Sequence, residues 1–212
     1  MKFRRKSDVA AAPETVDESD SPEIDSGPTG PYDVDDLTDE RDDRVDLGSL
    51  VIEPEEGREL RLQVDEKTGN VQAVVLAGHD GALELRAFAA PRNGDLWGEV
   101  RPQIAADMAR RGGTATEREG EFGTELLCQI TVTRPDGTTG TQPSRIIGVN
   151  GPRWLLRATL LGNPAIAPEA GAAWEDTLRR VAVRRGSHAL PVGEALPLVM
   201  PENARRVEPP AP

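Results

Sequence analysis

The chain has 212 residues and a formal net charge of −12 at pH 7, with 37% hydrophobic and 29% charged residues. This length holds one ordinary domain and a tail but not two full domains, because single domains commonly run to roughly 100 to 200 residues. A net negative protein is repelled by phosphate backbones and by anionic membrane surfaces, so the charge disfavours binding to nucleic acids and to membrane surfaces.

The negative charge is concentrated at the start of the chain. Residues 1–50 contain 6 Lys and Arg against 15 Asp and Glu, a net charge of −9, and the other 162 residues carry −3. Asp, Glu, Ser, Pro and Gly dominate this start, and such a composition does not bury enough apolar surface to offset the entropy of ordering the chain. We therefore predict a disordered acidic tail over residues 1–44, one folded domain over residues 45–201 and a disordered end over residues 202–212.

The sequence also bears on the cellular compartment and on membrane insertion. The basic residues at the very start are followed by acids and prolines, where a secretion signal would need an apolar run. Cys128 is the single cysteine, so no intramolecular disulfide can form, which fits a reducing compartment. No stretch approaches the roughly 20 apolar residues that span a bilayer. We expect a cytoplasmic protein without membrane insertion.

One segment of the acidic tail contains apolar residues. Tyr32, Val34 and Leu37 alternate with aspartates, a pattern typical of a segment that folds only against a partner. We take these three residues as a candidate partner-binding segment. A solvated linker is the alternative interpretation.

The folded part begins with strands and a helix. Polar turns join predicted strands at residues 60–64, 71–77 and 82–89 into a meander. Asp95 is placed to cap a following helix, which the glycines at 112–113 end. One face of this helix carries the apolar residues Trp97, Val100, Ile104 and Met108.

A second series of strands and a second helix follow. Residues 126–132 form a strand with Cys128 on its buried face, and a hairpin of residues 144–149 and 153–161 turns around Asn150-Gly151. The second helix covers residues 168–180, with one face formed by Ala170, Trp174, Leu178 and Val181. The proline-containing, apolar residues 191–201 cannot be helical, and we expect this strap to lie along the domain surface.

The order of these elements predicts the fold class. Short hairpin links imply antiparallel neighbours, so meander, helix, meander and helix form an α+β domain with an antiparallel sheet and both helices on one face. This order is similar to that of Mog1/PsbP-like domains. The likeness is an analogy of topology and implies no function.

The search for chemistry finds one cluster. The sequence has no phosphate-binding loop, dinucleotide fingerprint, zinc-protease motif or nucleophile elbow, and we predict no cofactor, no metal site and no catalytic residue. Strand alternation places Trp154 and Leu156 on one face and Arg153 and Arg157 on the other, and whether Arg145 of the partner strand joins them depends on the strand register, which the sequence around Pro152 does not fix. Forked guanidinium groups of this kind bind carboxylate or phosphate, so these three arginines are a candidate site for an anion or an acidic peptide. A plain solvated sheet face is the alternative.

Four segments resemble a known family. They are YDVDD at residues 32–36, DDRVDLG at 42–48, GPRWLLR at 151–157 and LPL at 196–198. The chain resembles an uncharacterised actinobacterial family, the domain of unknown function 3710, over residues 30 to 201. The resemblance implies a bacterial cytoplasmic protein and brings no activity, catalytic residue or cofactor with it.

From these observations we predict a non-catalytic protein-interaction module, with an unidentified protein partner and a regulatory acidic tail. The first alternative is a small anionic-ligand-binding protein or an enzyme of unfamiliar type, which a deep pocket lined by Arg145, Arg153 and Arg157 would favour. A flat face at these arginines would favour the interaction module. The second alternative is a nucleic-acid accessory protein, which would use the basic cluster Lys2, Arg4, Arg5 and Lys6.

Overall fold

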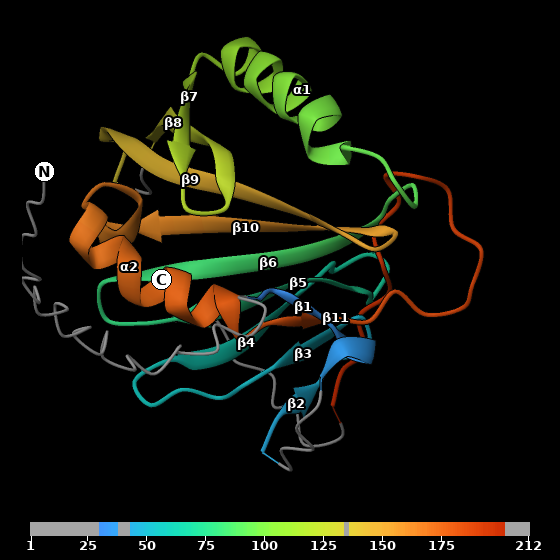
Figure 1. Cartoon of the computed structure of the whole chain (residues 1–212). Helices are drawn as coiled ribbons and strands as arrows, with labels where there is room; N and C mark the ends of the chain where they lie inside the picture. The colour runs from blue at the N-terminus through green and yellow to red at the C-terminus, as the bar shows by residue number, and fades with distance from the viewer. Residues whose placement is uncertain (1–29, 38–42, 134–135, 202–212) are drawn as a thin grey trace, which may run out of the picture.

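The computed structural model describes residues 30–37, 43–133 and 136–201 (Figure 1). The disorder predicted for residues 1–29, 38–42 and 202–212 falls outside this part of the chain. In chain order the elements are β1 (Tyr32–Asp33), β2 (Val45–Asp46), β3 (Leu50–Ile52), β4 (Glu59–Val64), β5 (Val71–Ala77), β6 (Gly81–Ala89), α1 (Leu96–Arg110), β7 (Thr114–Gly120), β8 (Gly123–Thr133), β9 (Thr139–Gly151), β10 (Trp154–Gly162), α2 (Pro168–Arg179) and β11 (Ala182–Val183), with short 3-10 helices at Val34–Asp36 and Asn163–Ala165.

The strands form two sheets. The large sheet has the order β4-β5-β6-β10-β9-β8-β7, and each of its neighbouring pairs is antiparallel. The small sheet has the order β1-β11-β3-β2 and contains one parallel pair, β1 with β11. The two meanders meet where β6 pairs with β10 along its whole length. The α+β class and the antiparallel sheet are therefore confirmed.

The two faces of the large sheet bury different helices. One face packs against the small sheet and α2, and its core contains Leu156, Ile147 and Trp174. The other face packs against α1 through Leu155, Ile146 and further residues, and we call it the α1 face. Because successive residues of a strand point to opposite faces, α1 and α2 lie on opposite sides of the sheet. Figure 1 shows α1 above β9, and α2 lies well separated from α1. The prediction of both helices on one face was wrong in this respect.

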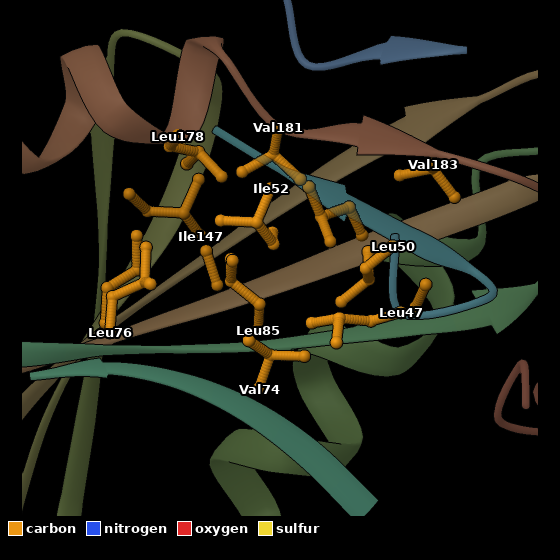
Figure 2. Packing of buried hydrophobic residues seen from close by; sticks show 14 of the residues in the cluster. Leu47, Leu50, Ile52, Val74, Leu76, Leu85, Ile147, Leu178, Val181 and Val183 are labelled. Carbon is orange, nitrogen blue, oxygen red and sulfur yellow. The ribbon is translucent and has the colours of Figure 1, made fainter. Parts of the chain in front are cut away.

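Figure 2 shows the larger core from close by. Leu47, Leu50 and Ile52 from the region of the small sheet point toward Val74 and Leu85 of the large sheet. All five side chains are buried with at most 1% exposure. This core holds the two sheets together.

Helix α1 begins where the sequence predicted. The Asp95 carboxylate accepts from Gly98 N at 2.8 Å, which caps the first turn. The helix continues through Pro102 to Arg110. Its N-terminal end is fixed over β9, because Trp97 N donates to the Asn150 side chain at 3.1 Å.

The β9–β10 hairpin turns two residues later than expected. Gly151 pairs with Trp154, and Pro152 with Arg153 forms the turn. Arg153 has φ 63°, a left-handed conformation that non-glycine residues seldom adopt. A Cβ on Gly151 would lie 2.1 Å from the Trp154 ring, so this glycine serves the packing of the indole inside the strand and does not form the turn.

The chain begins its folded part earlier than the predicted boundary at residue 45. Tyr32 pairs with Ala182 of β11, and Tyr32 N donates to Val181 O at 3.0 Å. The Trp154 indole N–H donates to the Asp33 carboxylate at 2.8 Å. These contacts connect residues far apart in the sequence, which explains why local composition did not indicate them.

The C-terminal strap lies along the surface, as expected, and joins the two sheets. Strand β5 pairs only with residues 82–85 of β6, and the strap pairs beyond that point, where Leu196 N donates to Ala87 O at 2.9 Å. Val199 N donates to Leu47 O at 2.9 Å, next to the small sheet. Leu196 is buried and anchors the strap in the core.

Candidate functional site

A groove of about 670 Å³ lies between α1 and the large sheet, and we call it the α1 groove. One wall is α1, and the other is the α1 face of β6, β8, β9 and β10. Its apolar lining consists of Phe88, Leu96, Val100, Ile104, Met108, Ile130, Ile146, Leu155 and Leu161. Its polar and charged lining consists of Glu84, Gln103, Asp107, Arg110, Arg111, Gln142, Ser144, Arg157 and Thr159. A concave site that combines apolar walls with polar groups is typical of a ligand pocket.

Two arginines lie side by side on the strands of this groove. Arg157 on β10 stands directly opposite Arg86 on β6, so both side chains are on the α1 face. Both guanidinium groups lie over the Phe88 ring, 5.5 Å from its centroid for Arg86 and 5.3 Å for Arg157. The Glu84 carboxylate is 3.9 Å from Arg157 Nη2, at the outer limit of an ion pair.

The surroundings of Arg157 disfavour the positive charge of its guanidinium group. The Arg157 side chain is only 25% exposed. Burial lowers the pKa of Arg157, the charge of Arg86 lowers it further, and the charge of Glu84 acts in the opposite direction. Arg86 Nε is buried without a hydrogen-bond partner among the described residues. An anion between the two guanidinium groups would supply both the missing acceptors and the missing negative charge.

More positive charge lies at the other end of the groove. Arg110 Nη2 is 2.9 Å from the Asp107 carboxylate, and Arg111 follows as the last residue of the helix end. The lining thus has three arginines against the two carboxylates of Glu84 and Asp107. Together with Arg86, which stands opposite Arg157 but does not itself line the groove, these residues make the α1 groove locally positive in a protein whose net charge is −12.

Arg145 does not join Arg157, contrary to the sequence prediction. It is opposite Leu160 in the register, which places it on the face that α2 covers, and it is only 3% exposed. Arg145 Nε donates to Glu125 at 2.7 Å, and Arg145 Nη2 donates to Glu175 of α2. Arg118 also donates to Glu125, so two arginines face these two carboxylates and Arg145 is part of a buried ionic network.

Arg153 is separated from Arg157 as well, because it stands in the β9–β10 turn. Of the three predicted arginines, the structure places only Arg157 in the α1 groove. Its neighbours Arg86, Glu84 and Phe88 were missed, although they alternate along one strand and so share a face. The pairing of β6 with β10 was the missing information, because it brings residues 86 and 157 together.

The candidate partner-binding segment is held by the chain's own domain. Tyr32 lies in β1, Val34 lies in a 3-10 helix and Leu37 follows as its cap. Cys128 is buried in the core under α1, as predicted, and burial raises the pKa of its thiol. A buried thiol of raised pKa is a poor nucleophile at neutral pH.

The sequence was also compared with known proteins. A family model described as a protein of unknown function, DUF3710, matches residues 30–207. The chain belongs to the DUF3710 family. The DUF3710 match starts at Gly30, the first described residue, and it therefore includes β1 and all strands of the α1 groove. No curated protein matches the chain.

One solved structure similar to this DUF3710 chain is the solution structure of cyanobacterial PsbP (CyanoP) from Synechocystis sp. PCC 6803. The two share 12% sequence identity with a TM-score of 0.38, and the likeness covers 66% of this chain and 91% of the other. In the part of this DUF3710 chain that the structure describes, no helix is long and apolar enough to cross a membrane.

Proposed function

We propose that this protein is a non-catalytic, cytoplasmic binding protein that holds an anionic ligand in the α1 groove. The observation that carries the proposal is the cross-strand pair of Arg86 and Arg157, two half-buried guanidinium groups, of which Arg157 has one carboxylate at 3.9 Å and Arg86 has a buried Nε without a hydrogen-bond partner among the described residues. Two such groups side by side can donate forked hydrogen bonds to one carboxylate, sulfonate or phosphate group.

The electrostatic setting supports a ligand at this position. The net charge of −12 repels anions from the protein as a whole, so attraction requires a local arrangement of cations such as this one. The Phe88 ring holds both guanidinium groups by cation–π contact, which fixes them before a ligand arrives.

The composition of the groove supports binding over turnover. Its described lining residues include no histidine, lysine or cysteine, and the carboxylates Glu84 and Asp107, which could act as general bases, lie within ion-pair distance of Arg157 and Arg110. The role of a protein-interaction module with a regulatory acidic tail stays a prediction, since no contact among the described residues bears on a partner.

A pair of fluorescent probes tests the proposal. Anilinonaphthalene sulfonate combines an aromatic body with one negative charge, and phenyl-naphthylamine is its uncharged relative. We expect the sulfonate to bind the folded protein, and Arg157→Gln or Arg86→Gln to weaken that binding about 10-fold or more, because a charge-assisted hydrogen bond contributes about 1.5–3 kcal/mol. Binding of the uncharged probe should change little.

Arg153→Gln is the matched control, because it removes an arginine of the same domain that stands in the β9–β10 turn and not in the groove. It should bind the sulfonate as tightly as the unaltered protein. Equal sulfonate binding by Arg157→Gln, Arg86→Gln and Arg153→Gln would contradict the proposal, as would an equal loss in all three.

A further inference from the structure

The direction of α1 relative to the strands gives the α1 groove two distinguishable ends. At the start of the helix, Trp97 lies against Gly148 of β9, since a Cβ on that glycine would be 2.1 Å from the indole. At the other end, Gly113 lies against Gln129 of β8 in the same manner. Helix α1 therefore runs antiparallel to β9. Its first turn lies over the last residues of the strand, and its last turn lies toward the first residues of the strand.

The arginine pair lies at the first of these ends. Arg157 is opposite Gly148, the residue that Trp97 covers. Continuing along β10 toward the other end of α1, the next residues on the same face are Thr159 and then Leu161. The groove is thus a track that starts at Arg86 and Arg157 and continues alongside the helix.

Beyond the arginines, apolar side chains lie on both walls of the track. Ile104 and Met108 of α1 face Leu161, Ile146 and Ile130 of the strands. From Val100 to Met108 the helix rises about 12 Å at ~1.5 Å per residue. From Arg157 to Leu161 the strand advances about 13 Å at ~3.3 Å per residue, so both walls give the same length.

The charges along the track also restrict the ligand. Glu84 is opposite Thr159, one step past the arginines, and Asp107 lines the far end. The Glu84 carboxylate would repel a negative charge on the part of the ligand next to the arginines, whereas the charge of Asp107 is matched by Arg110 at 2.9 Å. At about 670 Å³, the groove has much more room than an inorganic anion occupies.

From this geometry we infer that the ligand is an elongated amphipathic anion: a single anionic head group held by Arg86 and Arg157, with an uncharged apolar chain lying along α1 toward Leu161 and Met108. This inference rests on the proposed function and specifies the class of ligand. Carboxylate, sulfonate and phosphate heads share the chemistry that the arginines recognise.

A chain-length series tests the inference. Acetate, hexanoate, octanoate, decanoate and dodecanoate are titrated against the full chain, by calorimetry and by displacement of anilinonaphthalene sulfonate. Affinity should rise about two- to fourfold per added methylene, because each methylene leaves water partly or fully. It should level off once the chain is longer than the track, and decanol should bind much more weakly than decanoate.

Two variants at Met108 locate the chain. Met108→Gln should reduce the affinity for decanoate about 10-fold or more by placing an amide against the chain, and leave hexanoate binding nearly unchanged. Met108→Leu keeps an apolar side chain of similar volume and should retain the full series. Far-ultraviolet circular dichroism confirms that each variant is folded.

The results distinguish a failure of the amphipathic-ligand inference from a failure of the proposed anion site. Equal affinities for acetate and decanoate, both lost in Arg157→Gln, would overturn the amphipathic ligand and leave the anion site standing. The same holds if Met108→Gln and Met108→Leu bind decanoate equally well. Binding of decanoate that is unchanged in Arg157→Gln and Arg86→Gln would overturn both the inference and the proposed function.

Discussion

Replacing Arg145 by methionine separates a structural arginine from a ligand-binding one. Arg145 is 3% exposed and donates to Glu125 and Glu175, and Glu125 is itself 1% exposed. Methionine fills most of the same space, so the main change is that the buried Glu125 and the partly buried Glu175 lose their shared cation. Glu125 keeps one partner, Arg118, whose Nε donates to the Glu125 carboxylate at 2.8 Å.

The expected loss in free energy of unfolding follows from this burial. Breaking a buried ion pair by removing one partner costs about 3–5 kcal/mol, because the remaining charge stays buried. The partner that Glu125 retains keeps the loss toward the lower end of this range. With an m-value of about 1–3 kcal/mol/M in urea, the unfolding midpoint should fall by about 1 to 3 M.

Urea titration followed by circular dichroism and tryptophan fluorescence measures this loss. The matched control is Arg110→Met, which removes an ion pair with Asp107 whose arginine is 70% exposed and should cost less than about 1 kcal/mol. In water, the folded fraction of Arg145→Met should still bind anilinonaphthalene sulfonate with normal affinity. A loss in free energy of unfolding as small as that of Arg110→Met would refute the reasoning from burial. A loss of sulfonate binding without a loss of stability would show that Arg145 belongs to the binding site.

Three further predictions concern the α1 face. Arg157→Gln should change the free energy of unfolding by less than about 1 kcal/mol without ligand, because burial and the charge of Arg86 already disfavour the charged side chain; a loss above about 2 kcal/mol in urea titration would count against this. Gly148→Ala should cost about 1–3 kcal/mol and weaken sulfonate binding, since the new Cβ would collide with Trp97 and displace α1; an alanine variant of normal stability would contradict the packing described. Cys128 should react slowly with a disulfide reagent at mildly alkaline pH until urea is added, because burial raises the pKa of its thiol and leaves little thiolate; fast labelling of the folded protein would show otherwise.

Local signals in the sequence were sufficient for most elements. The alternating residues of β4 to β6, the Asp95 cap and the stripe through Trp97 and Met108 predicted strands and helix where the structure has them. β7 was missed, because its sequence TATEREG has no apolar alternation and it pairs at the edge of the sheet. An edge strand of charged residues is common, since charge protects it from pairing with other chains.

The arrangement of elements in space was harder to predict, and the site depends on it. Leu155 and Leu156 are both buried, and such a continuous apolar run indicates a strand covered on both faces. Applied to β10, this signal would have placed one helix on each side of the sheet. The prediction left the register of β9 with β10 open, and the observed register places Arg145 opposite Leu160, on the other face from Arg157.

The binding site itself required the register between distant strands. Arg86 and Arg157 are 71 positions apart in the sequence and become neighbours only through the pairing of β6 with β10. No local pattern connects them. Likewise, the contact of Tyr32 with β11 involves residues 150 positions apart, so composition alone assigned this segment to the tail.

Nuclear magnetic resonance of the arginine side chains tests the anion site most directly. In a titration of the full chain with octanoate, the Nε–Hε signals of Arg86 and Arg157 should shift together and saturate with one dissociation constant, while those of Arg145 and Arg153 stay in place. Octanoate binding that shifts other arginine signals and leaves Arg86 and Arg157 unmoved would contradict the account.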